Sequence, residues 1–190
     1  MGSSPRHQCF IYHGAPSSHL GDVSQTLIEN LKAGKHCLYL NSPTMVAGMR
    51  SHLAFAGVAL EEEIQRGALI LSSDRDHLCN GHFDVDQMLH QLEGAVKQSL
   101  EDGYAGLWAS GDMAWEFGNE KNMERLFAYE QRLEEFMQRE PALSGICLYH
   151  RDTLPAHVIE SGFLTHPVLY ITESLSLVNA RYHHYQSKGA

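Results

Sequence analysis

The 190-residue sequence lacks long apolar runs and is poor in basic residues. No stretch approaches the roughly 18 apolar residues of a membrane-spanning helix, and Met1 to Gln8 are polar, without the apolar core of a signal peptide. Lysine and arginine total 14 against 23 aspartates and glutamates, and this formal charge of -9 disfavours capture of nucleic acid or anionic membranes. We therefore expect a cytoplasmic protein that binds neither DNA nor a membrane directly.

Cysteine is scarce as well, and none of the four cysteines forms a CxxC pair. Cys9, Cys37 and Cys147 lie in apolar runs and Cys79 in a polar one, a pattern typical of reduced cysteines. The segment from Asp74 to His82 holds two histidines, a cysteine and two aspartates, but its spacing fits no standard zinc pattern. We expect no metal site and no cofactor, although scattered residues can still converge in three dimensions.

The sequence does have the composition of an ordinary globular domain, with 43% hydrophobic residues. Short apolar runs alternate with segments of helical period, which predicts βαβ units, a mostly parallel sheet and a three-layer α/β/α sandwich. Residues 7–172 would form this domain and residues 173–190 a polar tail. Strands are predicted at 9–12, 36–40, 68–71, 106–109, 145–149 and 168–171, and helices at 20–33, 42–57, 84–100, 119–138 and 156–164.

The turn from His13 to His19 follows the first predicted strand, where a nucleotide-binding protein carries its phosphate loop. Such a loop needs the pattern GxxxxGK[ST], whose lysine reaches the outer phosphates. Gly14 is present, but Ser18-His19 replaces the Gly-Lys pair, so we do not expect strong ATP binding by this mechanism. The simpler interpretation is a strand-to-helix turn with Ser17 or Ser18 as the N-cap.

Two acidic residues are candidates for a binding site. Asp112 follows the fourth predicted strand and, with Trp115, could line a small pocket with one polar anchor, or it could cap the next turn. Glu130 falls beside the apolar stripe of the predicted helix 119–138, where a carboxylate needs a partner such as His7, Tyr149 or an arginine. At the edge of that stripe it would be a solvated charge. The sequence contains no HExxH or GxSxG motif and no evident Cys-His pair, so we expect no enzyme.

Several segments together resemble the MEDS family, the sensory domain named for methanogens, methylotrophs and the dichloromethane-responsive regulator DcmR. The resemblance spans His7 to about Ile171 and implies a RecA-like fold, of the type found in circadian-clock ATPases, with a degenerate phosphate loop. The segments are HQCFIY (7–12), AGKHCLY (33–39), GHFD (81–84), GDMAW (111–115), LFAYE (126–130) and ICLY (146–149).

The resemblance also implies a function. The family is proposed to sense small hydrocarbon derivatives in prokaryotic signalling and is usually fused to a histidine kinase or a helix-turn-helix domain, so this chain would relay to a separate partner. Asp112 stands where the family usually has glutamate, and Cys147 could simply be a small apolar residue of a buried strand. The candidate ligand-binding residues are His7, His13, Asp112, Trp115, Glu130, Cys147 and Tyr149.

Two other functions stay open at this point. The chain could be a residual nucleotide-binding protein or hydrolase that uses His19 or Lys35 in place of the lost lysine, and Asp112 for magnesium. It could also be a scaffold that regulates a signalling partner and binds no small ligand. By analogy with RecA-like folds, an exposed sheet edge would permit a homodimer.

Overall fold

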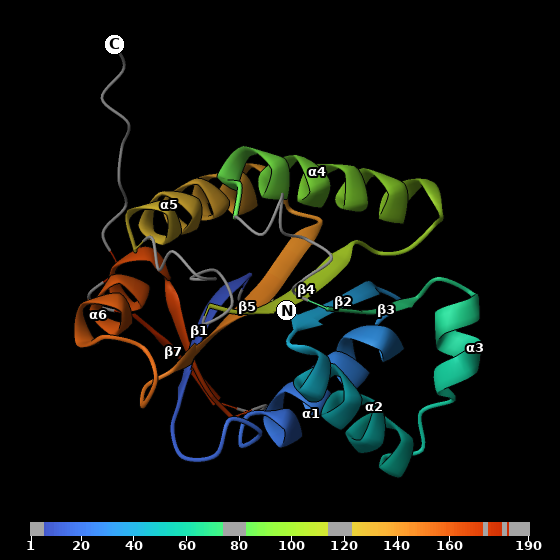
Figure 1. The fold of residues 1–190 in the computed structure, drawn as a ribbon. Helices are drawn as coiled ribbons and strands as arrows, with labels where there is room; N and C mark the ends of the chain where they lie inside the picture. The colour runs from blue at the N-terminus through green and yellow to red at the C-terminus, as the bar shows by residue number, and fades with distance from the viewer. Residues whose placement is uncertain (1–5, 74–82, 114–122, 173–174, 180–181, 183–190) are drawn as a thin grey trace.

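One β-sheet with helices on both faces forms the framework of the chain (Figure 1). The computed structural model describes residues 6–73, 83–113, 123–172, 175–179 and 182. The elements in chain order are β1 (His7–Tyr12), α1 (Leu20–Lys32), β2 (His36–Asn41), α2 (Pro43–Phe55), α3 (Leu60–Gln65), β3 (Leu69–Ser73), α4 (Val85–Glu101), β4 (Leu107–Asp112), α5 (Met123–Arg139), β5 (Leu143–His150), α6 (Ala156–Thr165), β6 (Val168–Thr172) and β7 (Leu175–Val178).

The strand order in the described part of the sheet is β3-β2-β4-β5-β1-β6-β7. Neighbours from β3 to β6 pair in parallel, and only β7 runs antiparallel to its neighbour β6. Each parallel connection crosses over through helices, which confirms the predicted α/β/α layers. The carboxyl ends of the parallel strands therefore meet at one edge of the sheet.

The strands bury side chains on both faces, so each face has its own core. On β1, Cys9 and Ile11 pack toward α4, α5 and α6, whereas Phe10 and Tyr12 pack toward α1 and α2. Figure 1 shows α4 and α5 on one side of the sheet and α1 and α2 on the other. Burial on both faces explains why the strands read as short, nearly continuous apolar runs in the sequence.

Local signals fix two of the helix starts. Ser42 caps α2 with its side chain ahead of Pro43, and Asp84 caps α4 through a hydrogen bond of 2.9 Å from a backbone amide. Both starts agree with the prediction. The predicted serine cap of α1 is wrong, because the helix follows His19, whose side chain makes no capping hydrogen bond.

Two elements are absent from the sequence prediction. The short helix α3 has three glutamates in its first turn and only two apolar residues, the partly buried Leu60 and Ile64, which is too short a pattern from which to predict a helix. Strand β7 lies inside the segment predicted as a polar tail, where it extends the sheet beside β6. The C-terminal part of the chain is thus joined to the core at residues 175–178.

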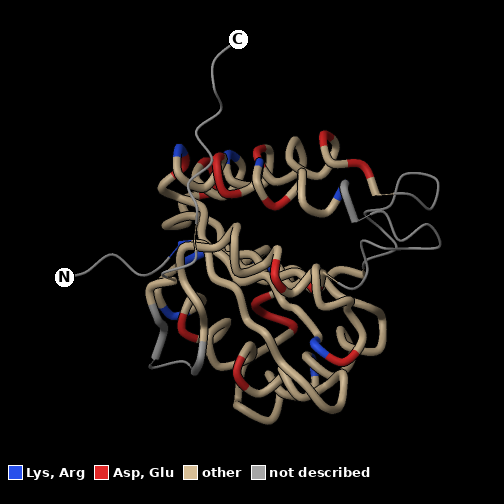
Figure 2. Tube along the Cα trace, turned by 90° about the vertical axis from the view of Figure 1, so that its left-hand side faces the viewer, with Lys and Arg blue, Asp and Glu red and all other residues tan. Residues whose placement is uncertain are grey.

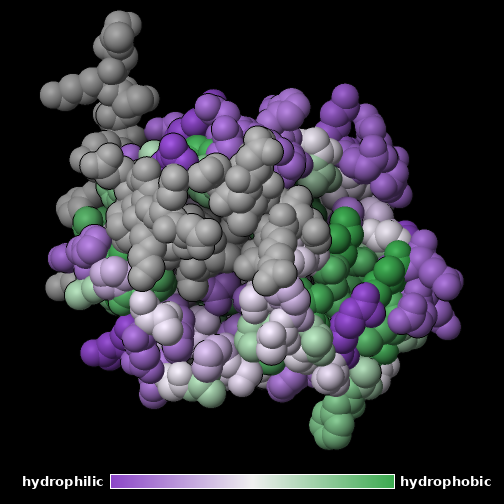
Figure 3. All heavy atoms as spheres, in the orientation of Figure 1, coloured by the Kyte–Doolittle hydropathy of each residue, from purple (hydrophilic) through white to green (hydrophobic). Residues whose placement is uncertain are grey.

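The outer surfaces differ from one side of the molecule to the other. Acidic and basic residues lie along α4 and α5 (Figure 2), where Arg132 forms an ion pair of 2.7 Å with Asp86. Apolar surface appears on the side of β3 (Figure 3), and Ile70 of this edge strand is 42% exposed. A strand edge with an exposed apolar side chain can pair with another chain.

Candidate functional site

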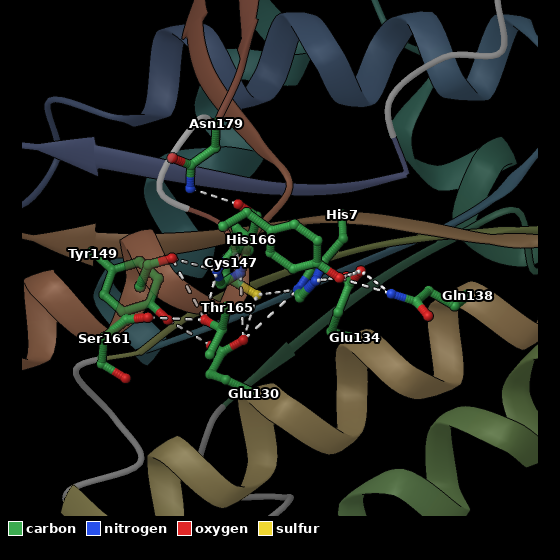
Figure 4. A network of polar contacts seen from close by, with 12 residues as sticks. His7, Glu130, Glu134, Gln138, Cys147, Tyr149, Ser161, Thr165, His166 and Asn179 are labelled. Atoms are coloured by element: carbon green, nitrogen blue, oxygen red, sulfur yellow. Dashed lines mark hydrogen bonds and ion pairs between the residues drawn. The ribbon is translucent and has the colours of Figure 1, made fainter. Parts of the chain in front are cut away.

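Four chemically reactive side chains meet in the core between the sheet and helices α5 and α6 (Figure 4). They are His7 of β1, Glu130 of α5, Cys147 of β5 and His166, which directly follows α6. One donor atom from each residue lies within 4.8 Å of the donor atoms of the other three, and each of the four residues is at most 5% exposed. We call these four residues the His-Cys-Glu cluster.

The order of the strands brings this cluster together. Strand β1 lies between β5 and β6, and His7 pairs with Gly145, so that Cys147 follows two residues later on the same face. Strand β6 begins just after His166, whose ring centroid is 4.0 Å from that of His7. Glu130 reaches the same point from the buried stripe of α5.

The donor atoms of the cluster surround one point without forming short hydrogen bonds to each other. His7 Nε2 is 3.5 Å from Cys147 Sγ and 3.7 Å from Glu130 Oε2. Glu130 Oε2 is also 3.7 Å from Cys147 Sγ and 3.4 Å from His166 Nε2. The two separations between nitrogen and oxygen exceed the 2.7–3.2 Å typical of hydrogen bonds, and the Cys147 thiol is within reach of longer, weaker hydrogen bonds to His7 and Glu130.

Each histidine of the cluster is held from outside through its other ring nitrogen. His7 Nδ1 lies 2.7 Å from Glu134 Oε2, and His166 Nδ1 lies 2.9 Å from the carbonyl oxygen of Gly162. The carbonyl can only accept, so His166 Nδ1 carries the proton and its Nε2 presents a lone pair. With an ionised Glu134, the Nδ1 atom of His7 likewise carries a proton.

Tyr149 fixes the carboxylate of Glu130 on the side away from the histidines. Its hydroxyl donates a hydrogen bond of 2.8 Å to Glu130 Oε1, which leaves Oε2 facing the other three donors. The ring packs against α6 at Gly162, where an added Cβ would lie 3.0 to 3.2 Å from ring atoms. A glycine at this position lets the helix and the tyrosine approach closely.

Burial shifts the ionisation of these groups. It raises the pKa of Glu130, although His7, Tyr149 and Cys147 favour the ionised form and oppose the shift. Burial, and then the neighbouring His7, lower the pKa of His166 well below its usual value. Burial also acts to raise the pKa of Glu134, but hydrogen bonding to His7 overcomes it, and the net shift is downward. The carboxyl next to His7 Nδ1 therefore favours the ionised state.

An apolar groove of about 430 Å³ lies between α5 and α6. Leu126 and Phe127 of α5 and Val158 and Leu164 of α6 contribute to its walls. Leu126 precedes Glu130 by one helical turn, so the groove and the buried carboxyl share the same stretch of α5. The volume suits a small organic molecule.

A second polar cluster lies on the opposite face, at the carboxyl ends of the strands. Asp112, the last residue of β4, accepts a hydrogen bond of 2.7 Å from the hydroxyl of Tyr12, the last residue of β1. His19 Nε2 lies 2.9 Å from the hydroxyl of Tyr39, and His150 stacks on Tyr12 with 4.8 Å between ring centroids. Aromatic side chains thus fill the position where α/β proteins of this kind bind ligands.

The turn after β1 is bonded to the chain's own side chains. The backbone amide of Gly14 donates a hydrogen bond of 2.7 Å to the carboxylate of Asp152, and the Gly14 carbonyl lies 3.0 Å from His150 Nε2. In a nucleotide-binding protein a backbone amide of this turn would donate a hydrogen bond to a phosphate, whereas here it donates one to a carboxylate. The side chain of His13 is exposed.

The residues predicted from the sequence to form one binding site lie in different parts of the structure. It brings together His7, Glu130, Cys147 and Tyr149, and the expected contacts of Glu130 with His7 and Tyr149 are present. It places Asp112 on the other face of the sheet and His13 at the surface. Trp115 and the segment 74–82 lie outside the described residues.

Sequence reasoning missed His166 and Glu134. Glu134 could have been found, because it lies one turn after Glu130 on the same face of a strongly amphipathic helix. His166 carries no such signal. It lies between a helix and a proline, and its proximity to His7 depends on β6 pairing with β1.

Fold and sites together define a RecA-like α/β protein whose phosphate loop has lost the nucleotide-binding pattern. The flagellar accessory protein FlaH from Methanocaldococcus jannaschii has a similar structure, with a TM-score of 0.50 and 12% sequence identity over 90% of this chain and 76% of that one. At this identity the likeness shows the fold alone. A search of curated proteins found no significant match.

The family follows from the sequence profile. Residues 6–167 match the MEDS domain, the methanogen/methylotroph, DcmR sensory domain, and the chain belongs to this family. The match covers β1 to β5, five of the seven strands that the structure describes, and ends just before β6, so that β6 and β7 lie outside it. In the described part of the chain, none of the helices combines the length and apolarity needed to cross a membrane.

Proposed function

We propose that this chain is a non-catalytic sensory domain that binds a small hydrocarbon derivative and relays its state to a separate kinase or transcription regulator. The family supports the sensory role. The observation that carries the proposal is the apolar groove between α5 and α6, whose wall at Leu126 lies one helical turn from the buried Glu130. Apolar walls would hold an alkyl group, and the buried polar groups would orient a hydroxyl, amine or halogen.

The C-terminal segment offers a route for the signal. Tyr182 donates a hydrogen bond of 2.8 Å to Glu134, which in turn bonds His7. Asn179 donates a hydrogen bond of 2.7 Å to the carbonyl oxygen of His166. A ligand that shifted His7 or His166 would alter these hydrogen bonds and so the position of the residues that follow β7. Such a shift is effective only if the ligand binds the two arrangements with different affinity.

Nucleotide binding is the weaker candidate. The Ser18-His19 pair stands where a phosphate loop has Gly-Lys. The backbone amide of Gly14 donates a hydrogen bond to Asp152, and the hydroxyl of Tyr12 donates one to Asp112. A carboxylate on the loop amide and a tyrosine on the acidic residue disfavour a phosphate and a magnesium ion there. A scaffold without any ligand would not need the buried carboxylate of Glu130, because burying it costs free energy. A homodimer through the edge strand β3 is compatible with either function.

A thermal-shift titration of the full chain tests the class of ligand. The panel is methanol, methylamine and dichloromethane as small organics, with Mg-ATP as the competitor. A compound at about 100 times its dissociation constant adds about 2.7 kcal/mol, which raises the midpoint of a chain this size by about 5–10 °C. We expect a shift with a small organic and none with Mg-ATP. A shift with Mg-ATP alone would overturn the proposal, and no shift at all would favour the scaffold.

A further inference from the structure

We infer that the His-Cys-Glu cluster binds a divalent metal ion of the Zn²⁺ type, through His7 Nε2, Glu130 Oε2, Cys147 Sγ and His166 Nε2. This inference deepens the proposed function and rests on it for the role of the cluster, because it names an inorganic cofactor at the same place. Three independent features carry it: the spacing of the donors, the direction of their lone pairs, and the groups that hold them from behind.

The spacing of the donor atoms is that of a tetrahedral site. Zinc bonds of about 2.0–2.1 Å to nitrogen and oxygen and about 2.3 Å to sulfur place neighbouring donors about 3.4–3.6 Å apart. The four separations given above run from 3.4 to 3.7 Å. The two remaining separations, from His166 Nε2 to the donors of His7 and Cys147, are within 4.8 Å. Side chains from β1, α5, β5 and the connection between α6 and β6 thus already lie near the positions that a shared ion requires.

Both histidines turn their Nε2 atoms toward this point, and that of His7 lies 3.5 Å from Cys147 Sγ. His166 is fully buried, and its Nε2 has no hydrogen-bond partner among the described residues. The nearest polar atom is Glu130 Oε2 at 3.4 Å, which is also a lone-pair donor when ionised. Two lone pairs facing each other in a dry core repel, unless a proton or a cation lies between them. A metal ion satisfies both at once and also takes the lone pairs of His7 and Cys147.

The donor side chains are also hydrogen-bonded through their other polar atoms, as the ligands of known metal sites are. A ligating histidine almost always donates its second N–H to a carboxylate or a backbone carbonyl, and this bond fixes the ring orientation. His7 has Glu134 in that role and His166 has the Gly162 carbonyl. Tyr149 does the same for the second oxygen of Glu130.

The donor set also selects the class of metal. Two imidazoles and a thiolate suit Zn²⁺ and its neighbours in the first transition row, whereas Mg²⁺ and Ca²⁺ require oxygen ligands. As the metal–sulfur bond forms, the Cys147 thiol releases its proton to solvent. Together, the thiolate and the Glu130 carboxylate balance the charge of a divalent ion. Among the described residues, the ion pairs of Glu130 within 4 Å are to His7 and His166, so no permanent cation competes for this position.

The test is a metal titration of the full chain in the absence of any organic ligand. The purified protein is stripped with a chelator and titrated with Co²⁺, whose tetrahedral sites absorb in the visible and whose thiolate bond adds a charge-transfer band. We expect saturation at one Co²⁺ per chain, both spectral features, and their loss when Zn²⁺ displaces the cobalt. Absence of Co²⁺ uptake by the stripped, folded protein would overturn the inference.

Two cysteine variants make a matched pair. Cys147→Ser should remove the charge-transfer band and weaken metal binding, whereas Cys37→Ser, which changes a buried thiol on the other face of the sheet, should leave both unchanged. Equal spectra for these two variants would contradict the assignment. If Cys147→Ser fails to fold, Glu134→Gln decides, because loss of an outer partner lowers metal affinity about 10–100-fold. An unchanged affinity in Glu134→Gln would then overturn the inference.

The outcomes also separate this inference from the proposed function. Stabilisation by a small organic in metal-free protein, without metal uptake, would leave the sensory proposal standing and remove the metal. Tight metal uptake with no response to any organic compound in the metal-loaded protein would do the reverse.

Discussion

The hydroxyl of Tyr149 donates a 2.8 Å hydrogen bond to Oε1 of Glu130, and this buried contact joins β5 to α5. Because the tyrosine holds one carboxyl oxygen, the other oxygen is turned toward His7 and His166. The contact therefore sets the geometry of the whole His-Cys-Glu cluster, and its removal has predictable consequences.

Tyr149→Phe should lower the free energy of unfolding by about 1–3 kcal/mol, since the buried Glu130 carboxyl loses a donor that no water replaces. Urea denaturation measures the change. Tyr104→Phe is the matched control, because the Tyr104 hydroxyl donates to the Arg66 carbonyl in an exposed position. We expect the control to stay within about 0.5 kcal/mol of the wild type. Equal losses in the two variants would contradict a special role for the buried bond.

Gly162→Ala should destabilise the protein even though alanine is the better helix former. The new Cβ would lie 3.0 Å from the Tyr149 ring, and overpacking of this kind costs about 1–3 kcal/mol. Gly94 of α4 has nothing within 4 Å of an added Cβ, so Gly94→Ala should stabilise by about 0.5–1 kcal/mol. Thermal unfolding of both variants checks the opposite signs. A stabilised Gly162→Ala would show that α6 and β5 are less tightly packed than described.

Acid should destabilise the fold partly through His19. Burial lowers its pKa, the charge of Asp112 opposes the shift, and His150 and His52 add to it. Above the unfolded-state pKa of about 6.5 the ring is neutral in both states, and between that value and the lower pKa of the folded state the unfolded chain binds more protons. The free energy of unfolding then falls by up to about 1.4 kcal/mol per pH unit for this group. In urea titrations at pH 7.5 and 5.5, His19→Gln should reduce the loss on acidification. His90→Gln, on the exposed side of α4, should not.

Asn179→Ala should loosen the C-terminal strand without unfolding the domain. Asn179 donates hydrogen bonds to the carbonyls of Phe163 and His166 at the end of α6. Without them, amide protons of β6 and β7 should exchange faster, whereas those of β2 and β4 in the middle of the sheet should keep their protection. Faster exchange throughout the sheet would mean that the residue supports global stability instead.

Much of the fold could be predicted because both faces of the sheet are buried. The apolar runs of β1 and β5 and the stripe of α5 are visible in the sequence, and Ser42-Pro43 fixes the start of α2. The sequence also shows that the turn after β1 does not match a nucleotide-binding loop, because Ser18-His19 stands where the pattern requires Gly-Lys. Helix α3 could not be predicted, because its two apolar residues are too few to show a helical period. Strand β7 was not predicted, because its four residues lie in a largely polar segment.

The candidate site was only half predictable. Glu130 was found because a carboxylate beside an apolar stripe needs a partner, and His7 and Tyr149 are its partners. His166 was not found, because its place in the cluster depends on the pairing of β6 with β1 and on no local pattern. Asp112 was assigned to the same site only through the family motifs. Periodicity shows that a residue is buried, but the strand order decides which buried residues meet.

The most direct test of the account compares ligand binding in two carboxyl variants on opposite faces of the sheet. Glu130→Gln changes the His-Cys-Glu cluster and Asp112→Asn changes the strand-end cluster, each with nearly the same side-chain shape. Calorimetric titration with whichever of methanol, methylamine or dichloromethane stabilises the wild type most should show binding lost in Glu130→Gln and kept in Asp112→Asn. Binding lost only in Asp112→Asn would place the sensor at the strand ends and contradict the account.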